Sequence, residues 1–193
     1  INYDGQKVDF KGPWRRMRYL ESIAEFGGYS MEQLQTEQSV RELCRERRVE
    51  VDLKLPLAKL YDALFEEVVE PHLFQPTFIY DYPRELSPLA KKIPNQPDMT
   101  YRFEAFVANM EIANAFSELN DPMDQYDRFK QQMKDREQGD DEAHQMDTDY
   151  IEALEYGMPP AGGMGIGIDR VAMILSGNTS IREVILFPHL RNK

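Results

Sequence analysis

A short glycine-rich segment is the first feature of the sequence that could do chemistry. Glycines stand at three alternate positions, Gly163, Gly165 and Gly167, and Asp169-Arg170 follows at the start of an apolar run. Alternate residues of a strand face one side, so this spacing leaves one face of the strand without side chains. A nucleotide base could lie against that backbone, and Arg170 could stack on a ring or reach a phosphate. A glycine-rich strand that serves only packing explains the spacing equally well, so both interpretations stay open.

A second polar group lies in the otherwise apolar residues 104–118. It consists of three carboxylates, an amide and an aromatic ring: Glu104, Glu111, Asn114, Phe116 and Glu118. Buried carboxylates need a counter-charge, which could be a ligand ammonium group, a divalent metal ion, or an arginine or lysine of the protein. Glu104 and Glu111 suit Mg²⁺, which favours one or two carboxylates together with substrate phosphates. Asn114, Phe116 and Glu118 suit a small molecule that carries an ammonium group. The alternative is an exposed sheet face whose carboxylates meet solvent or surface lysines.

The geometry of this segment sets a condition on the site. Residues 102–108 and 111–118 predict two strands of a hairpin with a turn at Asn109-Met110. In that register Glu104 and Glu111 share one face, while Asn114, Phe116 and Glu118 lie on the other. All five can line one site only if a bulge near Ile112-Ala113 shifts the register by one residue.

The elements around these residues predict an α+β fold with a mostly antiparallel sheet flanked by helices. Residues 1–75 are expected to be mainly helical and to carry no chemistry, and residues 76–193 to contain the sheet and both polar groups. The predicted helices are residues 14–26, 31–47 (with Ser30 as N-cap), 55–69, 122–134, 150–156 and 169–175. The predicted strands, besides the hairpin and the glycine segment, are a short strand at 7–10, residues 77–82 and a buried closing strand at 184–187.

Composition excludes several classes of protein. A net charge of −11 over 193 residues opposes non-specific binding to a phosphate backbone. The single cysteine, Cys44, excludes an internal disulfide and suits a reducing compartment. The three histidines lack metal-ligand spacing, and Ser87 lacks the context of a nucleophilic serine. No apolar run is long enough to span a membrane and the N-terminus is no signal peptide, so a cytoplasmic location is expected.

Together these motifs resemble the C-terminal half of the catalytic domain of class II lysyl-tRNA synthetases. The resemblance covers essentially the whole chain. The matching segments are residues 3–5, 8–10, 13–16, 76–79, 81–83, 87–91, 102–104, 111–121, 139–143, 153–157, 163–170 and 185–188. The glycine segment corresponds to the class II signature called motif 3. The Asn-Phe-Glu pattern of the hairpin favours lysine over aspartate or asparagine as the substrate.

The resemblance implies a fold, a set of ligands and residue roles. The fold would be part of the class II catalytic domain. Glu104 and Glu111 would hold Mg²⁺ at the ATP phosphates. Asn114, Phe116 and Glu118 would contact lysine. The residues implied to bind the nucleotide are Glu111, Gly165, Gly167 and Arg170, of which Arg170 and Glu111 would also take part in catalysis. The reaction would join lysine to ATP as lysyl-adenylate and then transfer the lysyl group to tRNA-Lys.

The family pattern also includes parts that this sequence lacks. These are the anticodon-binding OB domain, motif 1 at the homodimer interface, and motif 2, which contacts the α-phosphate and completes the lysine pocket. The chain also begins without Met, so we expect a fragment that does not aminoacylate tRNA by itself. Two alternatives remain: a non-catalytic binding or regulatory module derived from a synthetase, and a paralogue that transfers lysine to a protein. The intact glycines and the segment 139–143 argue against the paralogue.

Overall fold

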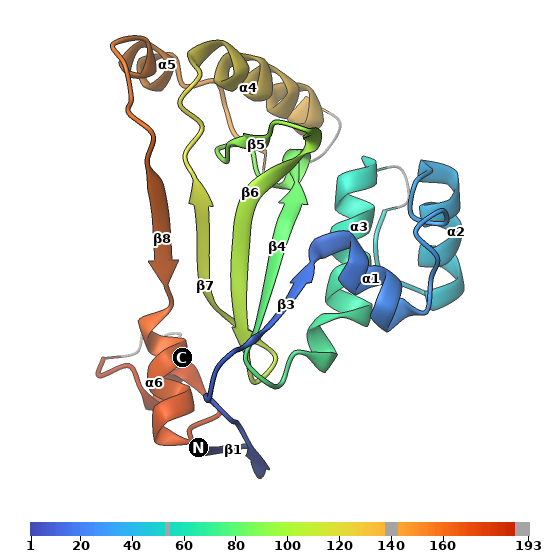
Figure 1. Ribbon diagram of the computed structural model, residues 1–193, viewed down its shortest axis with the longest axis vertical. Coiled ribbons are helices and arrows are strands. Elements are labelled where there is room, and N and C mark those ends of the chain that lie inside the picture. The colour runs from blue at the N-terminus through green and yellow to red at the C-terminus, as the bar shows by residue number, and fades with distance from the viewer. Residues whose placement is uncertain (53–54, 138–142, 188–193) are drawn as a thin grey trace, which may run out of the picture.

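A mixed β-sheet forms the centre of the computed structural model, which describes residues 1–52, 55–137 and 143–187 (Figure 1). Among these residues the strand order is β3-β4-β6-β7-β8, and the short β5 pairs with β6 off this path. The bounds are Arg15–Arg18 for β3, Thr77–Pro83 for β4, Lys92–Ile93 for β5, Gln96–Val107 for β6, Met110–Ser117 for β7 and Gly162–Ile166 for β8. The described pairings in this sheet are antiparallel except β3 with β4, which is parallel. The predicted α+β class is therefore confirmed, with a sheet that is mixed.

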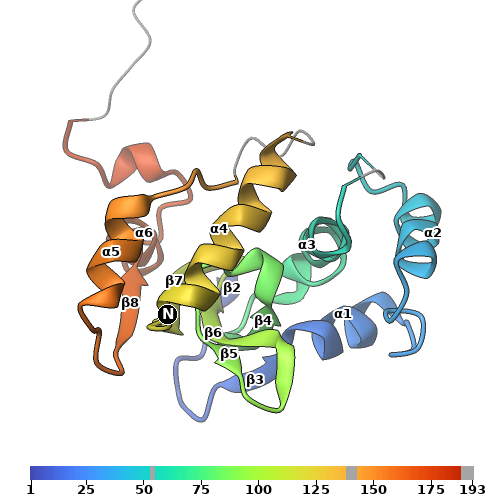
Figure 2. The same ribbon diagram turned by 90° about the horizontal axis from the view of Figure 1, so that it is seen from above.

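Three helices pack on the β3–β4 side of the sheet and form the larger core. They are α1 (Tyr19–Gly27), α2 (Glu37–Arg47) and α3 (Leu57–Val68), followed by the 3₁₀ turn Glu70–His72. Figure 2 shows them at one side of the molecule, with β8, α5 and α6 at the other. Tyr19, Leu60 and Leu64 are fully buried together with Ile79 of β4 and Phe106 of β6. The apolar face of α3 thereby holds that helix over the sheet face that carries Glu104.

Two of the predicted N-terminal helices are wrong in their first residues. Residues 15–18 of the predicted helix 14–26 form β3, because they pair with β4 from Arg15–Thr77 to Arg18–Tyr80. This non-local pairing overrides the helical periodicity. The second helix begins at Glu37 rather than Met31, since Thr36 is its N-cap and accepts a hydrogen bond from the Ser39 amide.

The remaining helices lie at the two ends of the sheet. At one end lie α4 (Pro122–Glu137) and α5 (Thr148–Glu155); at the other lies α6 (Ile168–Ser176), beside the small hairpin of β1 (Asn2–Tyr3) and β2 (Gln6–Lys7) (Figure 1). The predicted closing strand 184–187 is wrong: these residues follow a 3₁₀ turn, Ile181–Glu183, and Leu186 and Phe187 are each 88% exposed. No strand of the sheet pairs with this run in the described chain, so nothing holds it extended. The matching segment 139–143 lies, apart from Ala143, outside the described residues.

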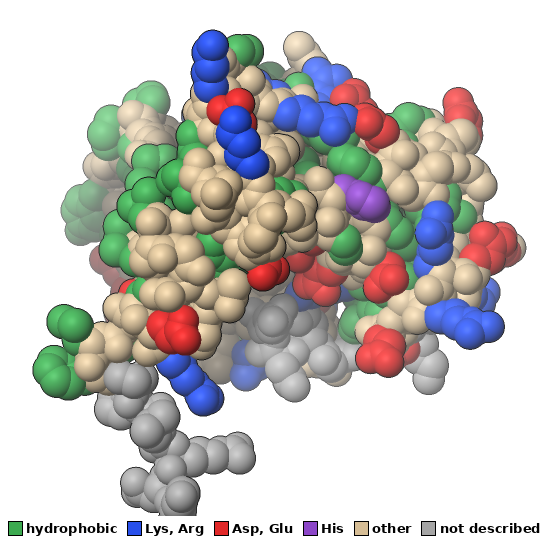
Figure 3. All heavy atoms as spheres, turned by 90° about the horizontal axis from the view of Figure 1, so that it is seen from below, with side chains coloured by type: hydrophobic (Ala, Val, Ile, Leu, Met, Phe, Trp, Pro, Cys, Tyr) green, Lys and Arg blue, Asp and Glu red, His purple; other side chains and the backbone are tan. Residues whose placement is uncertain are grey.

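Apolar side chains are also exposed on β8 and α6, including Met164, Ile168 and Leu175. In the view from below, hydrophobic side chains gather at this side of the molecule (Figure 3). Among the described residues, no helix is both long and apolar enough to cross a bilayer.

Candidate active site

A bulge in the β6–β7 hairpin brings the five predicted hairpin residues onto one face. The turn consists of Ala108 and Asn109, both at positive φ, rather than the predicted Asn109-Met110. Phe106 pairs with Glu111, but Ala105 pairs with Ala113, so Ile112 is an extra residue in β7. The predicted bulge near Ile112-Ala113 is thus confirmed.

The bulge changes which side chains stand together. Glu104 now pairs directly with Asn114, and Arg102 with Phe116. Directly paired residues point to the same side of a sheet, and alternate residues of a strand do so as well. Glu104, Glu111, Asn114, Phe116 and Glu118 therefore share one face, which the unbulged register would have divided.

The glycines of β8 extend this face. Gly165 pairs with Asn114 and Gly163 with Phe116, so both glycines lie on the side of the polar residues. A Cβ atom on Gly163 would stand 2.6 Å from Oε1 of Glu118, so the carboxylate lies directly over this backbone. Gly165 and Gly167 are exposed, and β8 pairs only with β7 in the described sheet. An exposed glycine face disfavours the interpretation that the segment serves only packing.

Glu104 is held in a largely buried network. Its side chain is 12% exposed and accepts hydrogen bonds from Oη of Tyr82 at 2.7 Å and from Nη2 of Arg102 at 2.5 Å. Burial raises the pKa of the Glu104 carboxyl above its usual range; Arg102 and the Tyr82 hydrogen bond oppose the rise, and the charge of Glu111 adds to it. The solvent-exposed sheet face considered above therefore does not describe Glu104.

Arg102 is a site residue that the sequence analysis did not single out. Its guanidinium contacts Glu104, Asn114 and the loop that follows β4, and lies over the ring of Tyr82 at 4.6 Å. Its place two residues before Glu104 on one strand puts both side chains on the same face, and that spacing could have identified it.

Glu111 pairs with Arg170, the first-turn residue of α6. Nη1 of Arg170 donates to the Glu111 backbone oxygen at 2.5 Å and to its Oε2 at 3.3 Å. The side chains are 36% and 47% exposed, so this ion pair contributes little stability. A Cβ on Gly167 would stand 3.5 Å from Cδ of Arg170, which is ordinary contact, so the arginine does not by itself require a glycine there.

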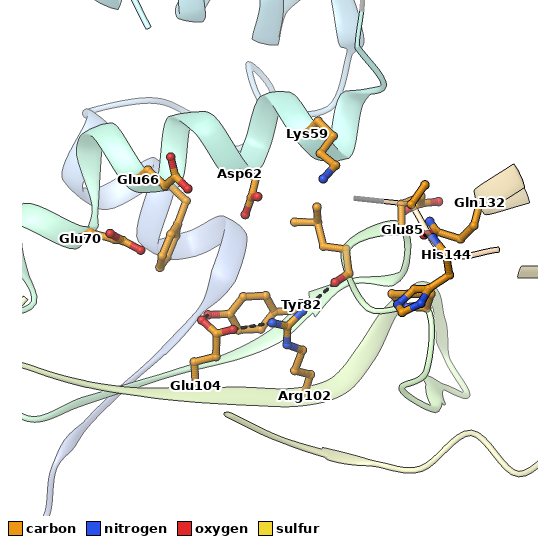
Figure 4. Close-up of a pocket in the computed structure, with 14 residues that line it drawn as sticks. Lys59, Asp62, Glu66, Glu70, Tyr82, Glu85, Arg102, Glu104, Gln132 and His144 are labelled. Atoms are coloured by element: carbon orange, nitrogen blue, oxygen red, sulfur yellow. Dashed lines mark hydrogen bonds and ion pairs between the residues drawn. The ribbon is translucent and has the colours of Figure 1, made fainter. Parts of the chain in front are cut away.

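Helix α3, in the part of the chain that is expected to carry no chemistry, supplies a wall of carboxylates opposite Glu104. Asp62 and Glu66 of α3, with Glu70 just beyond it, line a cavity of about 260 Å³ together with Arg102 and Glu104. In Figure 4 these three acidic residues lie on the helix side of the cavity, with Arg102 and Glu104 on the strand side. Burial, with repulsion from Glu66, Glu104, Asp62 and Glu111, raises the pKa of Glu70 to about 7. The four-residue spacing of these acids on one helix face could have revealed the wall.

The carboxylates of Glu104 and Glu111 fit the predicted Mg²⁺. Among the residues that the structure describes, no three His, Cys, Asp or Glu side chains are arranged to hold a metal ion. Two carboxylates suffice where substrate phosphates supply further ligands. Glu104 and Glu111 share a face, and the charge of Glu111 raises the pKa of Glu104, a repulsion that a divalent cation would relieve.

Comparison with known proteins relates this arrangement to one family. Residues 2–191 match the family described as tRNA synthetases class II (D, K and N). Three relatives, each aligned with the whole chain, are named lysine–tRNA ligase. The identity is 54% for Chloroflexus aurantiacus, 53% for Moorella thermoacetica and 47% for Staphylococcus aureus. The chain spans 39–40% of the length of these relatives.

Proposed function

The chain belongs to the class II tRNA synthetases of the D, K and N group, and on this basis we propose that it forms the lysine-binding and magnesium-holding part of a lysine–tRNA ligase. The observation that carries the proposal is the sheet face on which the bulge unites Glu104, Glu111, Asn114, Phe116 and Glu118. Metal ligands, an amino-acid pocket and a bare nucleotide platform need to be adjacent for a carboxylate to react with ATP.

Lysine would occupy the part of this face formed by Asn114, Phe116 and Glu118. The Glu118 carboxylate supplies the charge that an ammonium group needs, and the Phe116 ring supplies an apolar wall for the aliphatic chain. Aspartate and asparagine have no ammonium group at the end of the side chain and would leave the Glu118 charge uncompensated. The names of the relatives support the same choice within the D, K and N group.

ATP would occupy the part of the face formed by β8 and the start of α6. The bare backbone at Gly165 and Gly167 accommodates a flat base, and Arg170 can stack on it or reach a phosphate. Arg170 pairs with Glu111, so the nucleotide and the metal-holding carboxylates would be adjacent. A bound Mg²⁺ would supply charge neutralisation at the phosphates.

The residues of this chain would act by positioning and electrostatics. The lysine carboxylate oxygen forms a bond to the α-phosphorus of ATP as the bond to pyrophosphate breaks, which gives lysyl-adenylate. A hydroxyl of the terminal ribose of tRNA then attacks the carbonyl carbon, and AMP leaves. Neither step needs a protein nucleophile. Asn114 and Glu118 would orient the attacking molecule, and Arg170 would compensate charge on the phosphates.

The proposal extends to the partners of the whole protein. Lysine and ATP would bind here, tRNA-Lys would accept the lysyl group, and a second copy would form the homodimer that the family resemblance implies. A cytoplasmic location follows from this role in translation.

Lysine-dependent exchange of pyrophosphate into ATP, measured with the whole protein, tests the proposal. We expect exchange with lysine but not with aspartate or asparagine. Glu118→Gln should raise the KM for lysine about tenfold or more, since a charge-assisted hydrogen bond is lost, and leave the KM for ATP nearly unchanged. Exchange that requires aspartate or asparagine would refute the assignment. A folded protein without exchange for any of the three amino acids would favour the binding-module interpretation.

A further inference from the structure

We propose that Arg102 is a positioning residue that joins the lysine-binding end of the site to its metal-holding end. This inference rests on the proposed function and adds a residue to it. A change at Arg102 should then disturb lysine binding and magnesium dependence together, although the guanidinium itself belongs to neither group of residues.

The guanidinium of Arg102 contacts one member of each group. Nη2 donates to Oε1 of Glu104 at 2.5 Å and Nε donates to Oδ1 of Asn114 at 3.2 Å. The side chain is only 17% exposed and lies over the ring of Tyr82, which itself donates to Oε2 of Glu104. Both ends of the site are therefore bonded to one rigid, planar group.

The contact with Asn114 also sets the direction of its amide. Because Oδ1 accepts from Arg102, the Nδ2 group is the part of the side chain left to face the shared surface. Asn114 then presents hydrogen-bond donors to the substrate. Without Arg102 the amide could turn over and present its oxygen instead.

Arg102 also holds the loop that supports Glu118. Nη1 donates to the Leu86 backbone oxygen at 2.7 Å and to Oγ of Ser87 at 3.1 Å. The residues that follow in this loop pair with the end of β7: the Lys91 amide donates to Ser117, the Leu119 amide donates to Leu89, and Ala90 forms a bridge with Glu118. Arg102 thus helps to fix the position of the Glu118 backbone through this loop.

A lysine side chain in place of Arg102 could not reproduce these contacts. An ammonium group is a compact point charge at the end of a flexible chain, whereas the four contacts of Arg102 diverge from a planar fork. Arg128 offers a matched comparison, because this buried arginine holds the same loop through the backbone oxygens of Ser87 and Ala90. Its other contact is with Asp124, away from Glu104 and Asn114.

The test compares Arg102→Lys with Arg128→Lys in the whole protein, using lysine-dependent pyrophosphate exchange and thermal unfolding. For Arg102→Lys we expect the KM for lysine and the Mg²⁺ concentration at half-maximal rate to rise together, each about tenfold. For Arg128→Lys we expect a lower unfolding midpoint with an unchanged Mg²⁺ dependence. An Arg102→Lys protein that loses stability or kcat but keeps both of these parameters would overturn the inference.

A second variant keeps the inference testable if Arg102→Lys does not fold. Ser87→Ala removes one loop contact and leaves the bonds to Glu104 and Asn114, so the KM for lysine should rise by a few-fold with no change in Mg²⁺ dependence. An unchanged KM for lysine in this variant would overturn the inference. A parent protein without lysine-dependent exchange would instead refute the proposed function.

Discussion

Replacing Gly163 by alanine should weaken lysine binding through the carboxylate of Glu118. The added Cβ would stand 2.6 Å from Oε1 of Glu118, whereas ordinary contact begins at 3.4 Å. Restoring ordinary contact takes a shift equal to the difference, 0.8 Å, and the carboxylate is the part that moves because it is the end of a flexible side chain. Gly163 has no positive φ, so the substitution adds no backbone strain.

The size of the effect follows from the hydrogen bond that this carboxylate would make to the lysine ammonium group. Such charge-assisted bonds are about 2.7–2.9 Å long, and a retreat of this size brings the distance to the limit of hydrogen bonding, about 3.5 Å. Loss of a bond to a charged group costs about 1.5–3 kcal/mol. That corresponds to an increase of about 10- to 150-fold in the KM for lysine, with little change in the KM for ATP.

The matched control is Gly162→Ala, one residue earlier on the same strand. Its Cβ would lie 3.5 Å from the backbone oxygen of Phe116, which is ordinary contact. Both variants are assayed by pyrophosphate exchange at varied lysine and varied ATP. Equal values of the KM for lysine in the two variants, or an increase confined to ATP, would refute the placement of the lysine ammonium group at Glu118.

Three further predictions concern pH, the hairpin turn and the metal. The pKa of Glu70 is raised in the folded state, from 4.5 to about 7, so the folded state keeps a proton that the unfolded state loses, and stability falls as pH rises through this window. The full shift corresponds to about 3 kcal/mol, which solvent screening of a half-buried group reduces to about 1 kcal/mol. In urea unfolding, the free energy of unfolding of Glu70→Gln should therefore equal that of the parent near pH 4.5 and exceed it by about 1 kcal/mol at pH 8. Asn109→Gly should stabilise the chain by about 0.5 kcal/mol, since glycine adopts the positive φ of this turn freely, and an unchanged urea midpoint would contradict the strain argument. Glu111→Gln should raise the Mg²⁺ concentration needed for ATP binding about tenfold in isothermal titration, and an unchanged midpoint would exclude Glu111 as a metal ligand.

Local pattern was enough to predict the parts of the fold that depend on local sequence. Residues 77–82 lie between prolines and alternate in the manner of a strand, and they form β4. The predicted helix 150–156 forms as α5, which Asp147 begins as its N-cap by accepting a hydrogen bond from the Tyr150 amide. Residues 15–18 were mispredicted because their partner, β4, lies about sixty residues away, and such pairing leaves no mark on local periodicity.

The candidate site, like the fold, was predictable only where it depends on local sequence. The polar residues of the hairpin and the need for a bulge are both visible in the sequence. Side chains alternate between the two faces of a strand, so the five residues cannot share a face without an extra residue. The spacing of Arg102 and Glu104 places both side chains on one face, but the contacts of Arg102 with the loop after β4 are not visible in that spacing. The acidic wall at Glu70 likewise reaches the site only because α3 folds over the sheet. The roles of Glu104, Glu111, Asn114, Phe116, Glu118, Gly165, Gly167 and Arg170 stay predictions.

The single extra residue at Ile112 compensates for the odd spacing between Glu111 and Asn114. Deletion of Ile112 would leave Phe106 paired with Glu111 and Glu104 paired with Asn114, so regular alternation would keep all five side chains on one face. Deletion of Ala115 in the same strand would instead turn Phe116 and Glu118 to the side opposite Asn114. The site is therefore expected to tolerate the loss of one residue at the bulge but not the loss of one residue beyond it.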